Sequence, residues 1–272
     1  MKYFVAKEEA LIDVLQKLSP GSSKNTLKSW VEKGRVTVGG ALARRWNCNV
    51  QGEVCVGQRA AFADEGVKIL YEDLHLVVVD KPIGLLSVRT DSEAERTVHS
   101  ILKRRRTKVV YPVHRLDRET SGVMVFVYTF AAQKVLKEKF EAHAIEREYR
   151  GIVEGILKPK KGTWKSYLAE DTNYFMKSRP EGKLAITHYE VIQHRKHTTL
   201  VRFHLETGRK NQIRVHASEA GYPILGDKKY GSSSYSPMGR LCLHAHILGF
   251  DHPVTGKKLR FTSPIPSVFL SS

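Results

Sequence analysis

The chain has 272 residues, a length that suits one large domain or two modest domains with a sizeable core. It contains 45 Lys and Arg against 28 Asp and Glu, so its formal net charge is +17. With 41% hydrophobic and 27% charged residues the composition is that of an ordinary globular protein, and disorder does not explain the charge. The excess of positive charge predicts a polyanionic partner.

Nucleic acid fits this charge better than an anionic membrane, because no lipidation signal or basic amphipathic helix is evident. The least polar long run, residues 122–132, is shorter than the roughly 20 residues that a membrane-spanning helix needs. Charges within Met1–Glu8 come too early for a signal peptide. The cysteines Cys48, Cys55 and Cys242 form no C-x-x-C pair, which argues against a disulfide framework and a cysteine zinc site. We therefore expect a cytoplasmic protein that does not bind membranes.

The first part of the chain predicts two helices followed by short strands. Residues 9–19 carry apolar side chains at helical spacing and predict an amphipathic helix. Ser22 or Ser23 can cap a second helix over 24–33, and a glycine follows that helix. Residues 36–56 contain short β-rich stretches separated by glycine turns.

Basic residues collect on and after the second predicted helix. Charge alone leaves two interpretations open, a solvated helix face or a surface that follows phosphates. The pattern S-S-K-x-x-L-K-x-W-V-x-x-G-R-V-T-V-G-G resembles the S-four-like (α-L) RNA-binding module, which is attached to many RNA-modifying enzymes. The resemblance implies an RNA-binding domain over residues 1–62. It also implies that RNA backbone is met by Lys24, Lys28, Arg35, Arg44 and Arg45.

From about residue 66 the sequence predicts a mixed α/β domain. Leu76–Asp80, Val123–Val127 and Val201–Leu205 are short apolar runs rich in β-branched residues and predict strands. Phe130–His143 has the spacing of an amphipathic helix. No repeat of 20–50 residues is visible, so a solenoid is not expected.

The common cofactor and metal signatures are missing. The sequence contains no G-x-G-x-x-G, G-x-x-x-x-G-K-[ST] or G-x-S-x-G motif, and no zinc deaminase signature. His244, His246 and His252 are interpreted as hydrogen-bonding strand residues rather than metal ligands, because only Asp251 adds a carboxylate nearby. We expect chemistry without a cofactor or a metal.

One carboxylate stands out, Asp117, which lies between two arginines in a loop before the strand predicted at 123–127. A structural interpretation is that Asp117 only pairs with Arg115 or Arg118. Two other segments favour a site, since they add an aromatic ring at Tyr149 and a cation at Arg214. A carboxylate, a ring and arginines are the groups needed to hold a flipped base.

Three motifs in these segments resemble those of the RluA-type pseudouridine synthases: H-R-L-D-R-E-T-S-G, E-R-E-Y-R-G-I-V-E-G, and T-G-R-K-N-Q-I-R-V-H followed by G-Y-P-I-L-G-D. The match extends from Ile69 to about Pro266 in family order. It implies a catalytic domain over 66–272 with an α/β (α+β) fold, in which helices and loops flank a mixed, largely antiparallel sheet. One departure is Lys210-Asn211, where the family has Thr-His or Ser-His.

The resemblance implies a reaction and three catalytic residues. Such enzymes detach uracil from ribose, rotate it and reattach it through carbon, which needs no cofactor. Asp117 corresponds to the essential aspartate, which can attack the sugar, stabilise positive charge or take a ribose proton. Tyr149 would pack on the base and assist proton removal, and Arg214 would pair with the aspartate.

The resemblance also implies an RNA substrate and a set of substrate contacts. Large-subunit ribosomal RNA is favoured and tRNA is the alternative; a catalytically silent ribosome-assembly protein and a nuclease are the competing functions. The enzyme is expected to be a monomer. The basic run from Lys103 to Lys108 is expected to bind phosphates. Arg115 would fill the gap left by the flipped base. The expected contacts in this domain are Arg115, Leu116, Arg209 and Gln212.

Overall fold

The structure is a computed structural model that consists of two compact units, residues 1–63 and 64–272, each described here by itself. The division falls near the gap between the two domains expected from the sequence. The described residues are 2–32, 35–39, 41–43, 45–56, 62–63, 66–89, 96–105, 109–231 and 239–270.

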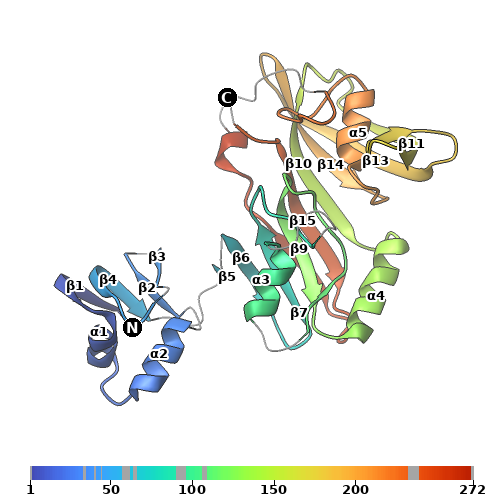
Figure 1. Ribbon diagram of the computed structural model, residues 1–272. Helices are drawn as coiled ribbons and strands as arrows, with labels where there is room; N and C mark the ends of the chain where they lie inside the picture. The colour runs from blue at the N-terminus through green and yellow to red at the C-terminus, as the bar shows by residue number, and fades with distance from the viewer. Residues whose placement is uncertain are drawn as a thin grey trace. The chain divides into compact units, whose positions relative to one another are not determined.

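The first unit has two helices and a small antiparallel sheet of strand order β1-β4-β2-β3 (Figure 1). Its core forms where Leu15 and Leu27 of the helices pack against Val54 of the sheet. The elements are β1 (Lys2–Ala10), α1 (Leu11–Leu18), α2 (Lys24–Glu32), β2 (Val36–Val38), β3 (Ala41–Leu42), β4 (Asn49–Val56) and β5 (Phe62–Ala63).

Both predicted helices of this unit are present, with one correction at the start. The first helix begins at Leu11 rather than residue 9, because residues 2–10 form β1 and pair with β4 some 45 positions along the chain. Such a long-range pairing leaves no local signal. The second helix is capped by Ser23, whose Oγ accepts a hydrogen bond from the Thr26 N–H at 3.2 Å. Gly34 lies outside the described residues.

The second unit is built on one long sheet of order β12-β11-β13-β14-β10-β15-β9-β7-β6, with β16 beside β15 and β8 beside β9. Among the strands of this sheet the β15–β9 pairing is parallel and the other described pairings are antiparallel, so the predicted fold class is confirmed. The elements are β6 (Val67–Glu72), β7 (Leu76–Lys81), α3 (Val98–Arg105), β8 (Tyr111–Pro112), β9 (Ser121–Val127), α4 (Phe130–Glu141), β10 (Glu146–Glu154), β11 (Lys161–Glu170), β12 (Met176–Ser178), β13 (Lys183–His194), β14 (Thr198–Leu205), α5 (Gln212–Glu219), β15 (Leu243–Asp251), β16 (Lys258–Thr262) and a short 3₁₀ turn, η1 (Ser267–Phe269).

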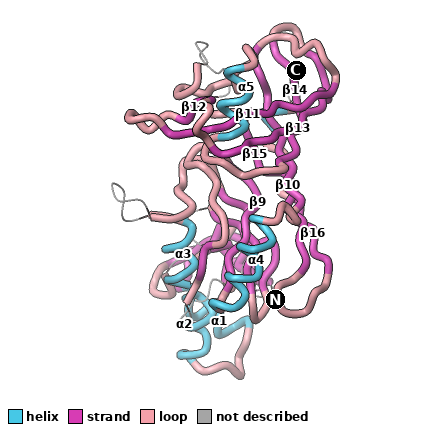
Figure 2. Tube along the Cα trace, turned by 90° about the vertical axis from the view of Figure 1, so that its right-hand side faces the viewer, coloured by secondary structure: helices cyan, strands magenta, loops and turns pink. Residues whose placement is uncertain are grey.

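The helices lie at the two ends of this sheet. Helix α5 lies beside β11 and β13, while α3 and α4 lie at the other end near β7 and β9 (Figures 1 and 2). Between the ends, β9, β10 and β15 are almost entirely buried, with Phe126 and Ile152 fully enclosed. The residues that connect these central strands therefore stand on a rigid base.

Several predicted elements occur with shifted ends. The predicted strands correspond to β7, β9 and β14, and the predicted helix to α4, which ends at Glu141 instead of His143. His143 takes a left-handed backbone conformation, φ +59°, which ends the helix. None of the helices in the described ranges is long and apolar enough to cross a membrane.

The basic run after residue 102 is only partly available to bind phosphate. Lys103 and Arg104 are exposed at the end of α3. Arg105 is instead held by Glu72, with Nη1 donating to the carboxylate at 2.7 Å, so the expectation of a phosphate contact is corrected there. Arg106 and Lys108 lie outside the described residues.

Candidate active site

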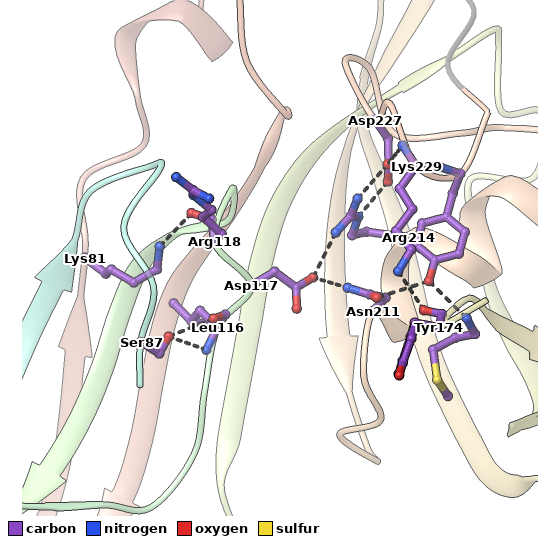
Figure 3. Close-up of polar contacts among 12 residues, drawn as sticks. Lys81, Ser87, Leu116, Asp117, Arg118, Tyr174, Asn211, Arg214, Asp227 and Lys229 are labelled. Atoms are coloured by element: carbon purple, nitrogen blue, oxygen red, sulfur yellow. Dashed lines mark hydrogen bonds and ion pairs between the residues drawn. The ribbon is translucent and has the colours of Figure 1, made fainter. Parts of the chain in front are cut away.

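The loop that carries Asp117, residues 113–120, is fixed on both sides of the carboxylate. Ser87 Oγ donates to the Leu116 carbonyl at 2.7 Å and accepts from the Leu116 N–H at 2.9 Å. On the other side, Lys81 Nζ donates to the Arg118 carbonyl at 3.1 Å (Figure 3). The Asp117 backbone is therefore held by hydrogen bonds to both of its neighbours.

Lys81 is a buried connector that sequence reasoning missed. Its ammonium group also donates to the carbonyls of Pro82 at 3.0 Å and Leu85 at 2.7 Å, so all three donors are used. Burial lowers the pKa of Lys81 to about 7, and the Asp117 carboxylate acts in the opposite direction. The signal was the D-K-P-I-G-L segment, which places a lysine at the end of a buried strand.

The loop ends at a position that only glycine can fill. Gly122 has φ +120°, and a Cβ atom there would lie 2.1 Å from the carbonyl oxygen of Ala245 on β15. The missing side chain lets β9 meet β15 in the parallel pairing that begins at Ser121. The start of β9, and with it the end of the Asp117 loop, is thus set by backbone contact.

His114, the histidine of the H-R-L-D motif, has a structural task. Its Nε2 accepts the Val125 N–H at 3.0 Å, and its ring stacks on Phe140 with centroids 4.8 Å apart. Burial lowers the pKa of His114 to about 3, and the charge of Arg147 acts in the same direction. The imidazole is therefore neutral at physiological pH and attaches the loop to β9.

Asp117 has one oxygen bound and one oxygen open. Asn211 Nδ2 donates to Asp117 Oδ2 at 2.6 Å, and Arg214 Nη1 donates to the same oxygen at 3.2 Å (Figure 3). Within the described part of the chain, Oδ1 accepts no hydrogen bond, and the side chain is 24% exposed. The carboxylate is oriented through Oδ2 and can react through Oδ1.

Arg214 makes the expected ion pair with Asp117, but its stronger partner is Asp227. Two parallel hydrogen bonds, each 2.7 Å, join the guanidinium to the fully buried Asp227 carboxylate. Burial acts to lower the pKa of Arg214, but the two carboxylates outweigh it and raise that pKa above its usual range. Asp227 was not among the expected site residues, although its motif, G-Y-P-I-L-G-D, was visible.

Asn211 explains the departure seen in the third motif. It has φ +53°, a left-handed conformation that asparagine tolerates, directly before α5. Tyr230 Oη donates to Asn211 Oδ1 at 3.0 Å and itself accepts the Met176 N–H at 3.2 Å. This chain of hydrogen bonds turns the NH₂ group of Asn211 towards Asp117. Its neighbour Lys210 pairs with Glu170.

Two pockets that share lining residues lie at or near Asp117. The smaller, about 70 Å³, includes Asp117 and Arg214, and the larger is about 600 Å³. Both are lined by Arg115, Tyr149, Leu205 and Arg209. Arg115 and Tyr149 thus lie where the expected substrate base would lie. Arg115 is exposed, and its side chain makes no hydrogen bond or ion pair with the residues that the structure describes.

Tyr149 lies on β10 and is partly buried. Burial raises the pKa of Tyr149 to about 12, although Arg147 acts to lower it. The phenol is therefore protonated at neutral pH, and its ring forms a wall shared by the two pockets. A neutral ring is suited to stacking on a base.

Gln212 has a structural role. Its amide donates to the carbonyl of Ile186 and to Thr187 Oγ1, both at 2.9 Å, and accepts from Thr207 Oγ1 at 2.7 Å and the Arg209 N–H at 3.0 Å. All four hydrogen-bonding positions are used inside the protein. Gln212 thus holds the loop before α5. It also lines the smaller pocket, and a contact with substrate stays a prediction.

The other residues expected to contact substrate differ in how much of the side chain is available for binding. Leu116 is buried and forms part of the smaller pocket. Arg209 lines both pockets, and its Nε donates to the Leu184 carbonyl at 2.9 Å, so part of its guanidinium is already bound.

The basic residues expected to meet RNA in the first unit lie on and after α2. Lys24 and Arg45 are exposed. Lys28 Nζ lies 4.0 Å from the centre of the Trp46 ring, and the Arg35 guanidinium lies 4.9 Å from that of Trp30. Arg44 lies outside the described residues.

The three histidines considered as metal ligands bind protein groups. His244 Nδ1 shares a hydrogen bond with Ser121 Oγ at 2.9 Å, and His246 Nδ1 binds the Ser263 carbonyl at 2.7 Å. His252 Nε2 binds Asp73 at 3.0 Å. Among the residues that the structure describes, no group of three or more His, Cys, Asp or Glu side chains is placed to hold a metal ion.

Comparison with known proteins decides the family. The sequence profile of the RNA pseudouridylate synthases matches residues 75–219, a range that contains Asp117, Tyr149 and Arg214. The chain belongs to the RNA pseudouridylate synthase family. One relative is the Pseudomonas aeruginosa protein named ribosomal large subunit pseudouridine synthase D, to which this chain is 32% identical. The alignment covers 96% of this chain and 90% of the relative.

Further relatives agree with this assignment. The protein of the same name from Xanthomonas campestris pv. campestris is 35% identical over 93% of this chain and 84% of the relative. Among solved structures, human RNA pseudouridylate synthase domain containing 4 has a TM-score of 0.61 at 24% identity. It covers 74% of this chain and 90% of that chain. This last likeness shows that the pseudouridylate synthase fold is shared.

Proposed function

We propose that this chain isomerises uridine to pseudouridine in large-subunit ribosomal RNA. The observation that carries the proposal is Asp117, a carboxylate that is fixed through Oδ2 and lines one pocket together with Tyr149. Family membership supports the reaction, and the names of the bacterial relatives support the ribosomal substrate. A cytoplasmic location and a monomeric state remain predictions.

The reaction requires one bond to break and one to form at the same sugar carbon. The N1–C1′ bond of uridine breaks, the uracil turns, and a C5–C1′ bond forms while C5 loses its proton and N1 gains one. Asp117 Oδ1 is positioned for each of the three routes open to a carboxylate: attack on C1′, stabilisation of positive charge there, or removal of a ribose proton. Asn211 and Arg214 hold the carboxylate in the same orientation for all three routes.

Tyr149 would hold the flipped uracil by stacking, which contributes about 1–3 kcal/mol per base. Its raised pKa means that the hydroxyl is protonated when substrate binds, so the phenol would take the C5 proton only after giving up its own. Arg115, on the exposed rim of both pockets, is placed to occupy the gap that the flipped nucleotide leaves in the RNA.

The first unit would bind RNA backbone as an S-four-like module. Lys24 and Arg45 are exposed there, and Lys28 is stacked on Trp46, which leaves its charge at the surface. Its two helices followed by a small sheet are consistent with the sequence resemblance.

The test is to map pseudouridines in ribosomal RNA and tRNA from cells with and without the gene. Loss of one or more pseudouridines from large-subunit RNA, restored by the wild-type gene, is expected. Loss confined to tRNA would move the substrate to that class. An unchanged map would favour the alternative of a silent RNA-binding protein, and RNA cleavage by the purified protein would favour a nuclease.

A further inference from the structure

The larger pocket beside Asp117 has a strongly basic lining. It is about 600 Å³ in volume and adjoins α4 and β10. Its described lining contains a single carboxylate, Glu141, which lies at the exposed end of α4. The arginine and lysine side chains of the lining are Arg115, Lys137, Arg147 and Arg209, and two histidines, His114 and His143, also line the pocket.

Arg147 is the buried member of this set, and its charge is not neutralised. Its side chain is enclosed, with the residue only 8% exposed, and Nη2 donates to the carbonyls of Leu205 at 3.3 Å and Glu206 at 2.7 Å. Its Nε is buried without a hydrogen-bond partner. Within the described ranges no carboxylate pairs with it. A buried charge without an opposite charge destabilises the folded chain, and a bound anion would offset that cost.

The described groups around Arg147 include no negative charge that pairs with it, and they leave space for a bound anion. Burial lowers the pKa of Arg147. The nearby Arg209, which carries the same charge, acts in the same direction. Gly208 lies against the guanidinium, where a Cβ atom would come within 2.5 Å of Arg147 Nη1. Two guanidinium groups without a carboxylate between them form a natural anion site, because each presents several N–H donors in a fixed plane.

We infer that this pocket binds a backbone phosphate of the RNA strand next to the target uridine, with Arg147 as its buried contact and Lys137 at its rim. The inference rests on the proposed function. Arg115, Tyr149, Leu205 and Arg209 line both pockets, so a strand whose base enters beside Asp117 passes directly over the basic lining. The phosphodiester charge then compensates the buried guanidinium, which converts the cost of Arg147 in the free enzyme into binding energy for RNA.

Helix α4 offers a matched pair of variants for the test. Lys137 lines the pocket, whereas Lys134, which is one turn earlier and also exposed, does not. RNA binding is measured with the full chain and a large-subunit RNA fragment that contains the mapped uridine, at several salt concentrations. We expect Lys137→Gln to reduce the slope of log Kd against log salt by about one phosphate contact and to raise KM about three- to ten-fold at unchanged kcat. Lys134→Gln should match the wild type.

Arg147→Gln should show the same loss of salt dependence, and thermal unfolding reports whether this variant still folds. If it does not, the Lys137 and Lys134 pair still decides the question. Equal salt slopes and KM values for Lys137→Gln and Lys134→Gln would overturn the inference. Inorganic phosphate distinguishes an RNA phosphate from free phosphate as the ligand. If inhibition by inorganic phosphate depends on Lys137 but RNA affinity does not, the pocket binds free phosphate. That result would also overturn the inference.

The proposed function fails in a different way. A wild-type protein that forms no pseudouridine contradicts the isomerase reaction, whatever the variants bind. An active wild type with indistinguishable lysine variants contradicts only the phosphate site.

Discussion

Asn211 and Asp117 are joined by a 2.6 Å hydrogen bond from the side-chain amide of the first to Oδ2 of the second. The bond comes from the residue at which this chain departs from its resemblance to the RluA-type enzymes. Because Tyr230 fixes the orientation of the amide, the donor is in place before substrate arrives. The same carboxylate oxygen accepts from Arg214, so the other oxygen is reserved for the reaction.

Removal of this donor should slow the reaction more than it weakens RNA binding. Asn211→Ala is expected to lower kcat about 10- to 100-fold, the effect of losing a hydrogen bond to a charged group, with KM within about two-fold of the wild type. Asn211→His should restore most of the rate, since an imidazole N–H can donate in the same direction. Tyr230→Phe should give a smaller loss, because the amide can then turn away. A normal kcat for Asn211→Ala would show that Arg214 alone orients Asp117.

Tyr149→Phe separates stacking from proton transfer. The ring is retained, so RNA affinity should stay near the wild-type value, while turnover should fall about ten-fold or more if the hydroxyl takes part in removing the C5 proton. Since burial raises the pKa of Tyr149 to about 12, a role for the phenolate also predicts that wild-type turnover rises with pH in the alkaline range and that the Phe variant loses this rise. Unchanged turnover would restrict Tyr149 to stacking.

These sites could be predicted to different depths from the sequence. Asp117, Tyr149 and Arg214 lie in motifs whose order and spacing are typical of the family. The sequence alone could therefore predict that these three residues meet in one pocket. The contact of Asn211 was not, because it depends on a left-handed backbone and on Tyr230, 19 residues further along. Asp227 was overlooked for the same reason: a buried ion pair is defined by two segments at once.

The helices and strands could likewise be predicted only where the local sequence pattern indicates them. Strands such as β7 and β9 have a local apolar pattern and were predicted, whereas β1 exists through its pairing with β4. Helix α5 was not predicted, because its buried side carries Gln212, Arg214 and His216. These polar side chains find their hydrogen-bond partners on other segments only in the folded chain.

Gly122→Ala should prevent proper docking of β9 on β15. The added methyl group would meet the Ala245 carbonyl at 2.1 Å in addition to the strain of φ +120°, so a loss of about 4 kcal/mol or more in unfolding free energy is expected. Gly221→Ala is the matched control, with φ +81° and no atom within 4 Å of the added Cβ. It should lose about 1 kcal/mol, the conformational strain alone. Equal losses in chemical denaturation would contradict the steric explanation.

His114 should make the fold sensitive to acid. Burial lowers its pKa from 6.5 to about 3, so between these values the unfolded chain binds more protons than the folded chain. Stability therefore falls as the pH falls from 6.5 towards 3, with a contribution of at most about 1.4 kcal/mol per pH unit. In His114→Gln an amide oxygen can still accept the Val125 N–H without titrating, and urea unfolding should show a flatter pH dependence. His197→Gln, at an exposed position, should keep the wild-type dependence.

The central claim is that Asp117 carries out uridine isomerisation. The most direct measurement is release of tritium from RNA labelled at C5 of uridine, because formation of the new C5–C1′ bond expels the hydrogen there. The wild-type chain should release tritium from large-subunit RNA. Asp117→Asn should release none while its melting temperature and RNA affinity stay near those of the wild type. Tritium release by Asp117→Asn at the wild-type rate would contradict the account.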